Sequence, residues 1–119
     1  MRVSVMALIL TPMNDYFRKV ERNAIFSPDK AAKADLFAGE RLFVGLNCFE
    51  AGQTQKIHAH SGADKFYYVC SGRARLTVGE ETREVGAGEI VWAPAGVPHG
   101  VEQALERTVL LVGIAPPPR

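Results

Sequence analysis

The sequence predicts an all-β protein, an antiparallel sandwich or barrel with at most one short helix near the N-terminus. The chain contains 11 glycines and 7 prolines among its 119 residues, and these separate short apolar runs. Turn-forming residues recur roughly every eight to twelve residues, which is the spacing of sandwiches and barrels. In residues 41–50 every second side chain is apolar, as in a strand with one buried face; these side chains are Leu42, Val44, Leu46 and Cys48.

The first part of the chain predicts two strands separated by a short helix. Residues 16–23 alternate polar and apolar side chains, which favours a strand. Ser27 and Pro28 are typical of a helix start, because serine caps the first turn and proline fits its first position. We therefore expect one or two helical turns within residues 28–34, followed by a turn and the strand at 41–50.

Seven further strands are predicted, and their boundaries contain glycine, proline, serine or aspartate. Ser71-Gly72 forms a tight connection, and Pro94-Ala95-Gly96 forms a rigid loop. The prolines at 116–118 have no N–H group to donate and end the sheet. The predicted strands span residues 54–60, 65–70, 73–78, 81–85, 89–93, 99–103 and 108–115.

The length of the chain suits a single domain. We expect an arm or extra strand over residues 1–13, a barrel domain over 14–115 and a proline-rich tail over 116–119. Both Met1 and Met13 are candidate translation starts.

Charge and cysteine content restrict the partners and the compartment. The net charge is +1 and no basic cluster is present, which argues against a nucleic-acid partner. The apolar run after Arg2 is too short to span a bilayer, so no membrane partner is expected. Cys48 and Cys70 lie in strand-like runs without a CxxC pair, which favours reduced, buried thiols and a cytoplasmic location.

Two of the three histidines lie two residues apart on a predicted strand. The side chains of His58 and His60 therefore point to the same face, about 7 Å apart at the backbone. An HxH pair on its own is a weak indication of a metal site, because solvent-facing and core histidines show the same spacing.

Two glycine-bounded segments surround the histidines and strengthen that indication. The first places its marker residues at Gly52, His58, His60, Lys65 and Gly72. The second places them at Gly88, Pro94, Gly96, His99 and Gln103. These segments resemble the two signature motifs of the cupin superfamily. The first family motif contains a glycine, His-x-His, a glutamate and a second glycine at this spacing. The second contains a glycine, Pro-x-Gly, a histidine and an asparagine. The resemblance covers residues 52–103.

The resemblance implies a double-stranded β-helix, the jelly-roll barrel of cupins, with one metal site inside it. His58, His60 and His99 occupy the family's ligand positions. Neutral imidazole is a good ligand for divalent transition metals such as zinc, iron, nickel or manganese. We expect one such ion, whose identity the sequence leaves open.

Lys65 departs from the family pattern, because it stands where cupins place a glutamate ligand. Three interpretations remain open: the three histidines bind the metal alone, Asp64 replaces the glutamate, or the pocket has lost its metal and Lys65 binds an anion. In a dry pocket Lys65 would have a lowered pKa and is the candidate catalytic base. Alternatively, its side chain swings out toward Asp64 and solvent.

Two aromatic residues are candidates for the pocket wall. Tyr67 shares the strand parity of Lys65, and Trp92 lies within the second motif. Core packing is the ordinary alternative for both, because aromatic side chains dominate small β cores.

The predicted function is that of a small metal-binding cupin that takes a small anionic molecule. The resemblance implies metal-assisted chemistry of the dioxygenase, isomerase or decarboxylase type. The alternatives are a ligand-binding or sensing cupin without turnover, with or without a metal, and a structural domain with a filled barrel. We also expect a homodimer that packs residues 16–50 across its interface, because exposed sheet edges invite aggregation.

Overall fold

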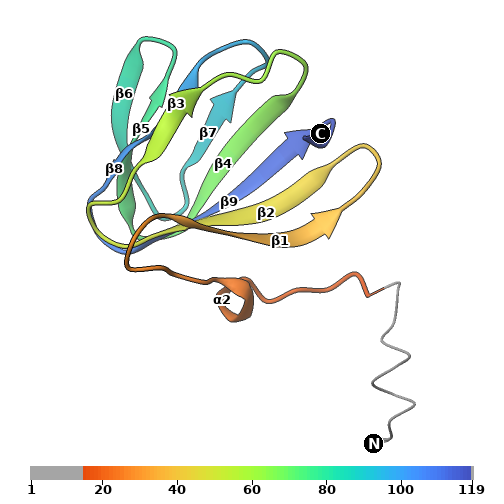
Figure 1. Cartoon of the computed structure of the whole chain (residues 1–119), viewed down its shortest axis with the longest axis horizontal. Helices are drawn as coiled ribbons and strands as arrows, with labels where there is room; N and C mark the ends of the chain where they lie inside the picture. The colour runs from red at the N-terminus through yellow and green to blue at the C-terminus, as the bar shows by residue number, and fades with distance from the viewer. Residues whose placement is uncertain (1–14, 119) are drawn as a thin grey trace, which may run out of the picture.

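The computed structural model describes residues 15–118 and contains two antiparallel sheets in that range (Figure 1). The five-stranded sheet has the order β1 (Ala32–Ala38), β2 (Phe43–Phe49), β9 (Thr108–Ala115), β4 (Asp64–Ser71) and β7 (Ile90–Ala93). The four-stranded sheet has the order β3 (Gln55–His58), β8 (His99–Ala104), β5 (Arg73–Val78) and β6 (Glu81–Gly86). The predicted all-β, antiparallel jelly roll is confirmed.

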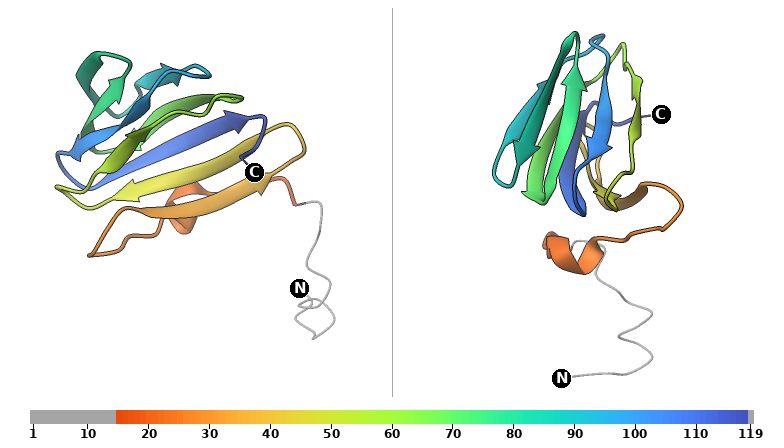
Figure 2. Two further views of the ribbon diagram at one scale, coloured as in Figure 1. Left: turned by 45° about the horizontal axis from the view of Figure 1, so that its top comes forward. Right: turned by 90° about the vertical axis from the view of Figure 1, so that its left-hand side faces the viewer.

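The main core lies between the two sheets, which face each other as two layers (Figure 2). Side chains that alternate along each strand meet there, as period-2 geometry requires. The five-stranded sheet contributes its inward side chains, and the four-stranded sheet closes over them. The core contains Phe49, Tyr67, Val69, Ala74, Leu76, Val85, Ala93, Val101, Ala104, Leu110 and Val112.

A second apolar cluster lies on the outer face of the five-stranded sheet. It consists of the side chains of β1, β2 and β9 that point away from the main core. Four of them are buried: Leu36, Leu46, Cys48 and Val109. The chain before β1 packs against this face through Val20, Ala24 and Phe26. Cys48 and Cys70 are both free thiols.

Two predictions for the N-terminal part of the chain are wrong. Residues 16–23 do not form a strand; they contain the one-turn helix α2 (Val20–Asn23), because no neighbouring strand offers them hydrogen-bond partners and Val20 packs on the outer cluster. No helix follows Pro28, and β1 begins at Ala32 instead. There, pairing with β2 satisfies the backbone and outweighs the helix-start pattern. The predicted arm over residues 1–13 lies outside the described residues.

The predicted strands from β2 onward agree closely with the structure, and β5 and β9 have the predicted bounds. The HxH strand is shorter than expected, because β3 ends at His58 and His60 lies in the following loop. Among the described residues no helix has the length and apolar character needed to cross a membrane.

Candidate metal centre

Three histidines converge at one opening between the sheets. His58 at the end of β3 is paired with His99, the first residue of β8, and His60 lies two residues beyond His58. The ring centroids are 4.6 Å apart for His58 and His99, 4.9 Å for His58 and His60, and 5.5 Å for His60 and His99. One ring nitrogen from each residue lies within 4.8 Å of the other two. Pairing of β3 with β8 therefore unites the two sequence motifs.

The backbone holds two of the imidazoles in one tautomer. Nδ1 of His58 lies 2.7 Å from the carbonyl oxygen of Lys56, and Nδ1 of His99 lies 3.0 Å from that of Val97. A carbonyl only accepts, so each Nδ1 carries the hydrogen and each Nε2 keeps a free lone pair. Metal-binding histidines commonly donate their other ring N–H in this way. Both imidazoles are thus prepared to bind an ion through Nε2.

Electrostatics keep two of the histidines in the neutral form that binds metals. Burial lowers the pKa of His60, and the positive charges of His58, Lys65 and Lys33 lower it further. Burial also lowers the pKa of His99, and the hydrogen bond to the Val97 carbonyl offsets part of this decrease. Neither imidazole therefore needs to lose a proton before binding an ion at neutral pH.

The residues fit a divalent transition-metal ion. Nε2 of His99 is buried and has no hydrogen-bond partner among the described residues. Leaving a buried polar atom unpaired costs about 1–3 kcal/mol, and a bonded ion would remove that cost. Three imidazoles are a donor set that such ions accept, and they leave coordination positions open for water or a ligand.

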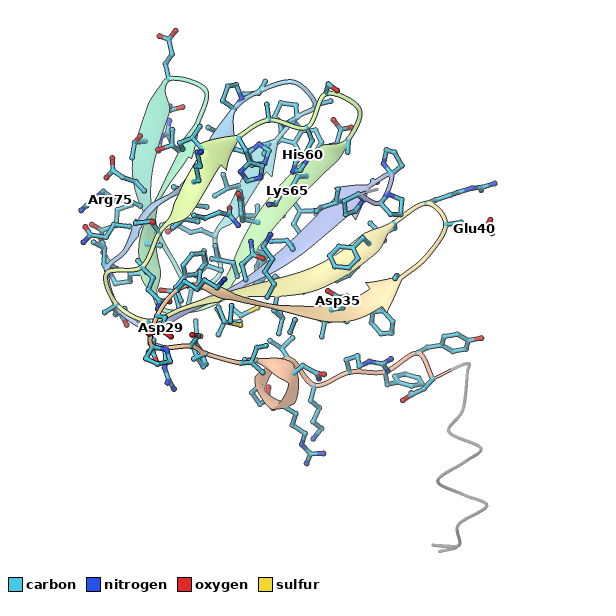
Figure 3. All side chains as sticks on the ribbon, viewed as in Figure 1. Asp29, Asp35, Glu40, His60, Lys65 and Arg75 are labelled. Atoms are coloured by element: carbon cyan, nitrogen blue, oxygen red, sulfur yellow. The ribbon has the colours of Figure 1, made fainter. Side chains whose placement is uncertain are left out.

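Lys65 lies inside the opening and not in solvent (Figure 3). Its side chain is only 4% exposed, and its Nζ stands 4.5 Å from the centre of the Tyr67 ring, a cation–π contact. Burial lowers the pKa of Lys65 to about 8, and the charge of Lys33 contributes to the shift. The alternative in which Lys65 swings out toward Asp64 is wrong.

Asp64 positions a loop and is not part of the histidine cluster. Its carboxylate accepts a 2.9 Å hydrogen bond from the N–H of Ala95. The N–H of Gly96 donates a second 2.9 Å bond to the carbonyl oxygen of His60. These two bonds attach the loop before His99 to the HxH segment, so Asp64 helps to hold the histidines together.

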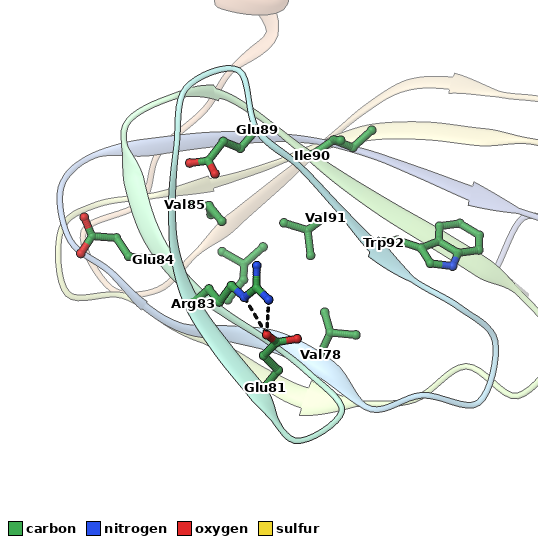
Figure 4. A pocket seen from close by; sticks show the side chains of 10 residues that line it. Val78, Glu81, Arg83, Glu84, Val85, Glu89, Ile90, Val91 and Trp92 are labelled. Atoms are coloured by element: carbon green, nitrogen blue, oxygen red, sulfur yellow. Dashed lines mark hydrogen bonds and ion pairs between the residues drawn. The ribbon is translucent and has the colours of Figure 1, made fainter.

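Tyr67 and Trp92 lie on opposite sides of the five-stranded sheet. Tyr67 is fully buried, its ring centroid lies 6.1 Å from that of His99, and its hydroxyl donates a 2.7 Å hydrogen bond to Oε1 of Gln55. Burial raises the pKa of Tyr67, so the phenol stays protonated. Trp92 is 57% exposed, because its neighbour Ala93 takes the inward position on β7. It lines a separate cleft near β6 and β7, so the structure does not bring it to the histidines (Figure 4).

The pocket beside the histidines has a volume of about 760 Å³. One wall is apolar and includes Phe43, Val112 and Ile114, and the other lining residues are mostly polar. Sequence reasoning missed Lys33 and Asn47, which also line it. Asn47 is a polar residue in an otherwise apolar strand, with parity opposite to Leu46 and Cys48, and that pattern was the available signal.

Comparison with known proteins assigns the family. The family described as "Cupin domain" matches residues 45–114, more than half of the chain. The chain belongs to the cupin family. The cupin fold and the three-histidine cluster thus occur together in this chain, at the positions where the motif resemblance placed them.

Several relatives share most of this cupin's length. The crystal structure of TT1209 from Thermus thermophilus is 40% identical, with a TM-score of 0.82, and the match covers 86% of this chain and 98% of that one. An uncharacterised protein of Streptomyces coelicolor is 39% identical over 103 residues, covering 85% of this chain and 95% of the relative. An RmlC-like cupin from Desulfovibrio desulfuricans is 24% identical, with a TM-score of 0.79 and coverage of 87% and 99%. At 24% identity, the similarity to the Desulfovibrio protein supports the fold alone.

Proposed function

We propose that this cupin binds one divalent transition-metal ion through His58, His60 and His99 and holds a small anionic molecule beside it. The observation that carries the proposal is the convergence of the three imidazoles, with Nε2 of His99 buried and unpaired among the described residues. When bound, the ion supplies positive charge and open coordination positions to an oxygen atom of the ligand.

The charges of the pocket support an anionic ligand. Lys33, Lys56 and Lys65 line it, against the single acidic side chain of Asp35 among the lining residues. None of these four residues forms an ion pair within the described part of the chain. A bound anion would neutralise charge that the pocket itself leaves uncompensated.

In the catalytic form of the proposal, Lys65 is the group that accepts or returns a proton. Its nitrogen is buried at the pocket and is held over the Tyr67 ring, within the region that a bound ligand would occupy. In the non-catalytic form the same pocket binds or senses its ligand without turnover. A metal-free form is the second candidate, and the observation that favours it is the lysine at the position of the usual carboxylate ligand.

The test is elemental analysis of the purified protein, followed by zinc titration of the wild type and of His99→Ala. We expect one zinc ion per wild-type chain and a zinc affinity at least about a hundredfold weaker in His99→Ala. A site with three ligands has no additional ligand to replace a lost one, and even residues that only hydrogen-bond to the ligands change metal affinity by about tenfold to a hundredfold. Trp92→Ala is the matched control and should leave the affinity unchanged. Absence of zinc binding in the folded wild type would contradict the metal and favour the metal-free form.

We also propose that two copies associate through the outer face of the five-stranded sheet and the chain before it. That face carries apolar side chains, and Tyr16 and Phe17 in the chain before β1 are 71% and 83% exposed. Light scattering at micromolar concentration should report a dimer, and a monomer would contradict this part of the proposal.

A further inference from the structure

We propose that the natural ligand carries two anionic groups: one faces the histidine centre, and the second is held by Lys33 and Asn47 on β1 and β2. This inference rests on the proposed function and deepens it, because it assigns a second subsite and a ligand class, short dianions such as dicarboxylates.

The second subsite is a cross-strand pair on the inward face of the sheet. Lys33 and Asn47 lie directly opposite each other in the β1–β2 register, and both line the pocket. Asn47 is 4% exposed, and its Nδ2 is buried without a hydrogen-bond partner in the described structure. An amide donor and an ammonium side by side are suited to the two oxygens of a carboxylate.

The two subsites belong to one cavity. Lys33 lines the same pocket as His58, His60 and Lys65. One pocket of about 760 Å³ therefore contains both proposed subsites.

The charges at the two ends call for two anionic groups. A divalent ion held by three neutral imidazoles receives no negative charge from its ligands, and Lys65 adds a positive charge where a carboxylate would reduce it. A single anionic group at this end leaves the ammonium of Lys33, an exposed residue at the rim of the pocket, without an ion-pair partner among the described residues. Asp35 does not pair with it, although it lies two residues away on the same strand and lines the same pocket.

The apolar part of the pocket lining suits a short hydrocarbon linker. Phe43, Val112 and Ile114 supply apolar surface to the same pocket, and the Tyr67 hydroxyl is already engaged with Gln55. A ligand with polar groups at both ends and an apolar middle matches this distribution.

Isothermal titration of the zinc-loaded protein tests the inference. The probes are the straight-chain dicarboxylates from oxalate to adipate, each compared with its own monomethyl ester. At least one diacid should bind about tenfold more tightly than its ester, because the ester lacks the charge-assisted contact with Lys33. In Lys33→Met this preference should fall to about threefold or less.

Two further variants make the result specific. Lys33→Arg keeps the charge and should retain the preference, whereas Lys30→Met removes an exposed lysine that does not line the pocket and should change nothing. The inference is overturned if no diacid is preferred over its ester, if the preference survives in Lys33→Met, or if Lys30→Met abolishes it equally. Failure of the wild type to bind zinc would contradict the proposed function itself, and the inference with it.

Discussion

The two sheets of this cupin leave two openings that differ in how their charged groups are satisfied. At the opening near β6 and β7 (Figure 4), every charged residue among the described lining has an ion-pair or hydrogen-bond partner. Arg83 pairs with Glu81, Glu84 pairs with Arg73, and Glu89 accepts a 2.6 Å hydrogen bond from the N–H of Gly86. At the histidine opening, Lys33 and Lys65 form no ion pair and the buried nitrogens of Asn47 and His99 lack partners, within the described part of the chain.

The difference separates a surface cleft from a binding site. Paired charges need no further ligand, so the opening that contains Trp92 is explained by the protein's own contacts. Buried donors without a partner, here Nδ2 of Asn47 and Nε2 of His99, cost stability unless something else satisfies them. Of these two openings, the histidine opening is therefore the one that supports the proposed ion and anion.

The largest expected effect concerns the cost of burying the Lys65 charge. Below pH 8 the lysine is charged in both the folded and the unfolded chain, so burial of the charge lowers the free energy of unfolding by its full amount. Between about pH 8 and 10.5 the folded protein has lost the proton while the unfolded chain still holds it, so the free energy of unfolding should rise with pH. Relative to that of Lys65→Met, the free energy of unfolding of the metal-free wild type should increase by up to about 3 kcal/mol over this pH interval.

Chemical denaturation at several pH values measures this difference. Arg83→Met, which removes a paired and exposed charge at the other opening, should show no comparable dependence. A flat difference between wild type and Lys65→Met would mean that the Lys65 ammonium reaches solvent.

The second expected effect is on metal affinity. Lys65→Glu should strengthen zinc binding by about tenfold or more, because a carboxylate replaces a repelling charge near the ion. Trp92→Glu introduces the same carboxylate at the other opening and should leave zinc affinity unchanged. An unchanged or weaker affinity in Lys65→Glu would show that residue 65 does not face the ion.

The smallest expected effect on zinc affinity tests how the strands position the histidines. A Cβ on Gly100 would lie 2.7 Å from the carbonyl oxygen of Gln55 and 2.9 Å from that of Lys56, so Gly100→Ala should push β3 away from β8. His58 and His99 would separate, and we expect zinc affinity about threefold to tenfold lower, with about 1–3 kcal/mol less stability. Gly86→Ala on β6, where the nearest atom is a flexible Arg73 side chain at 3.6 Å, is the control in titration and thermal melts. Equal effects of the two variants would contradict the positioning role of Gly100.

Strand parity explains which site residues could be predicted from the sequence. It places Tyr67 inward with Lys65, and motif spacing singles out the three histidines. On β7 the same alternation places Ala93 inward and Trp92 outward. Trp92 was assigned to the pocket because it is close to His99 in sequence, and that assignment failed because it ignored the alternation.

Tertiary pairing explains what the sequence did not reveal. Asn47 and Lys33 become neighbours only through the β1–β2 register, and a helix was expected where part of β1 lies. Residues 16–23 alternate like a strand, yet no described strand lies beside them, and packing of the partly buried Val20 against the outer cluster accompanies a helical turn instead. Local patterns cannot report a partner that comes from elsewhere in the chain.

A crystal of the protein soaked in zinc, measured at the zinc absorption edge, tests most directly whether the three histidines bind a metal ion. We expect one anomalous peak per chain at the histidine opening, about 2.0–2.1 Å from Nε2 of His58, Nε2 of His99 and a ring nitrogen of His60. A peak at the carboxylates of Glu81, Glu84 or Glu89 in the other opening, or no peak beside the histidines, would contradict it.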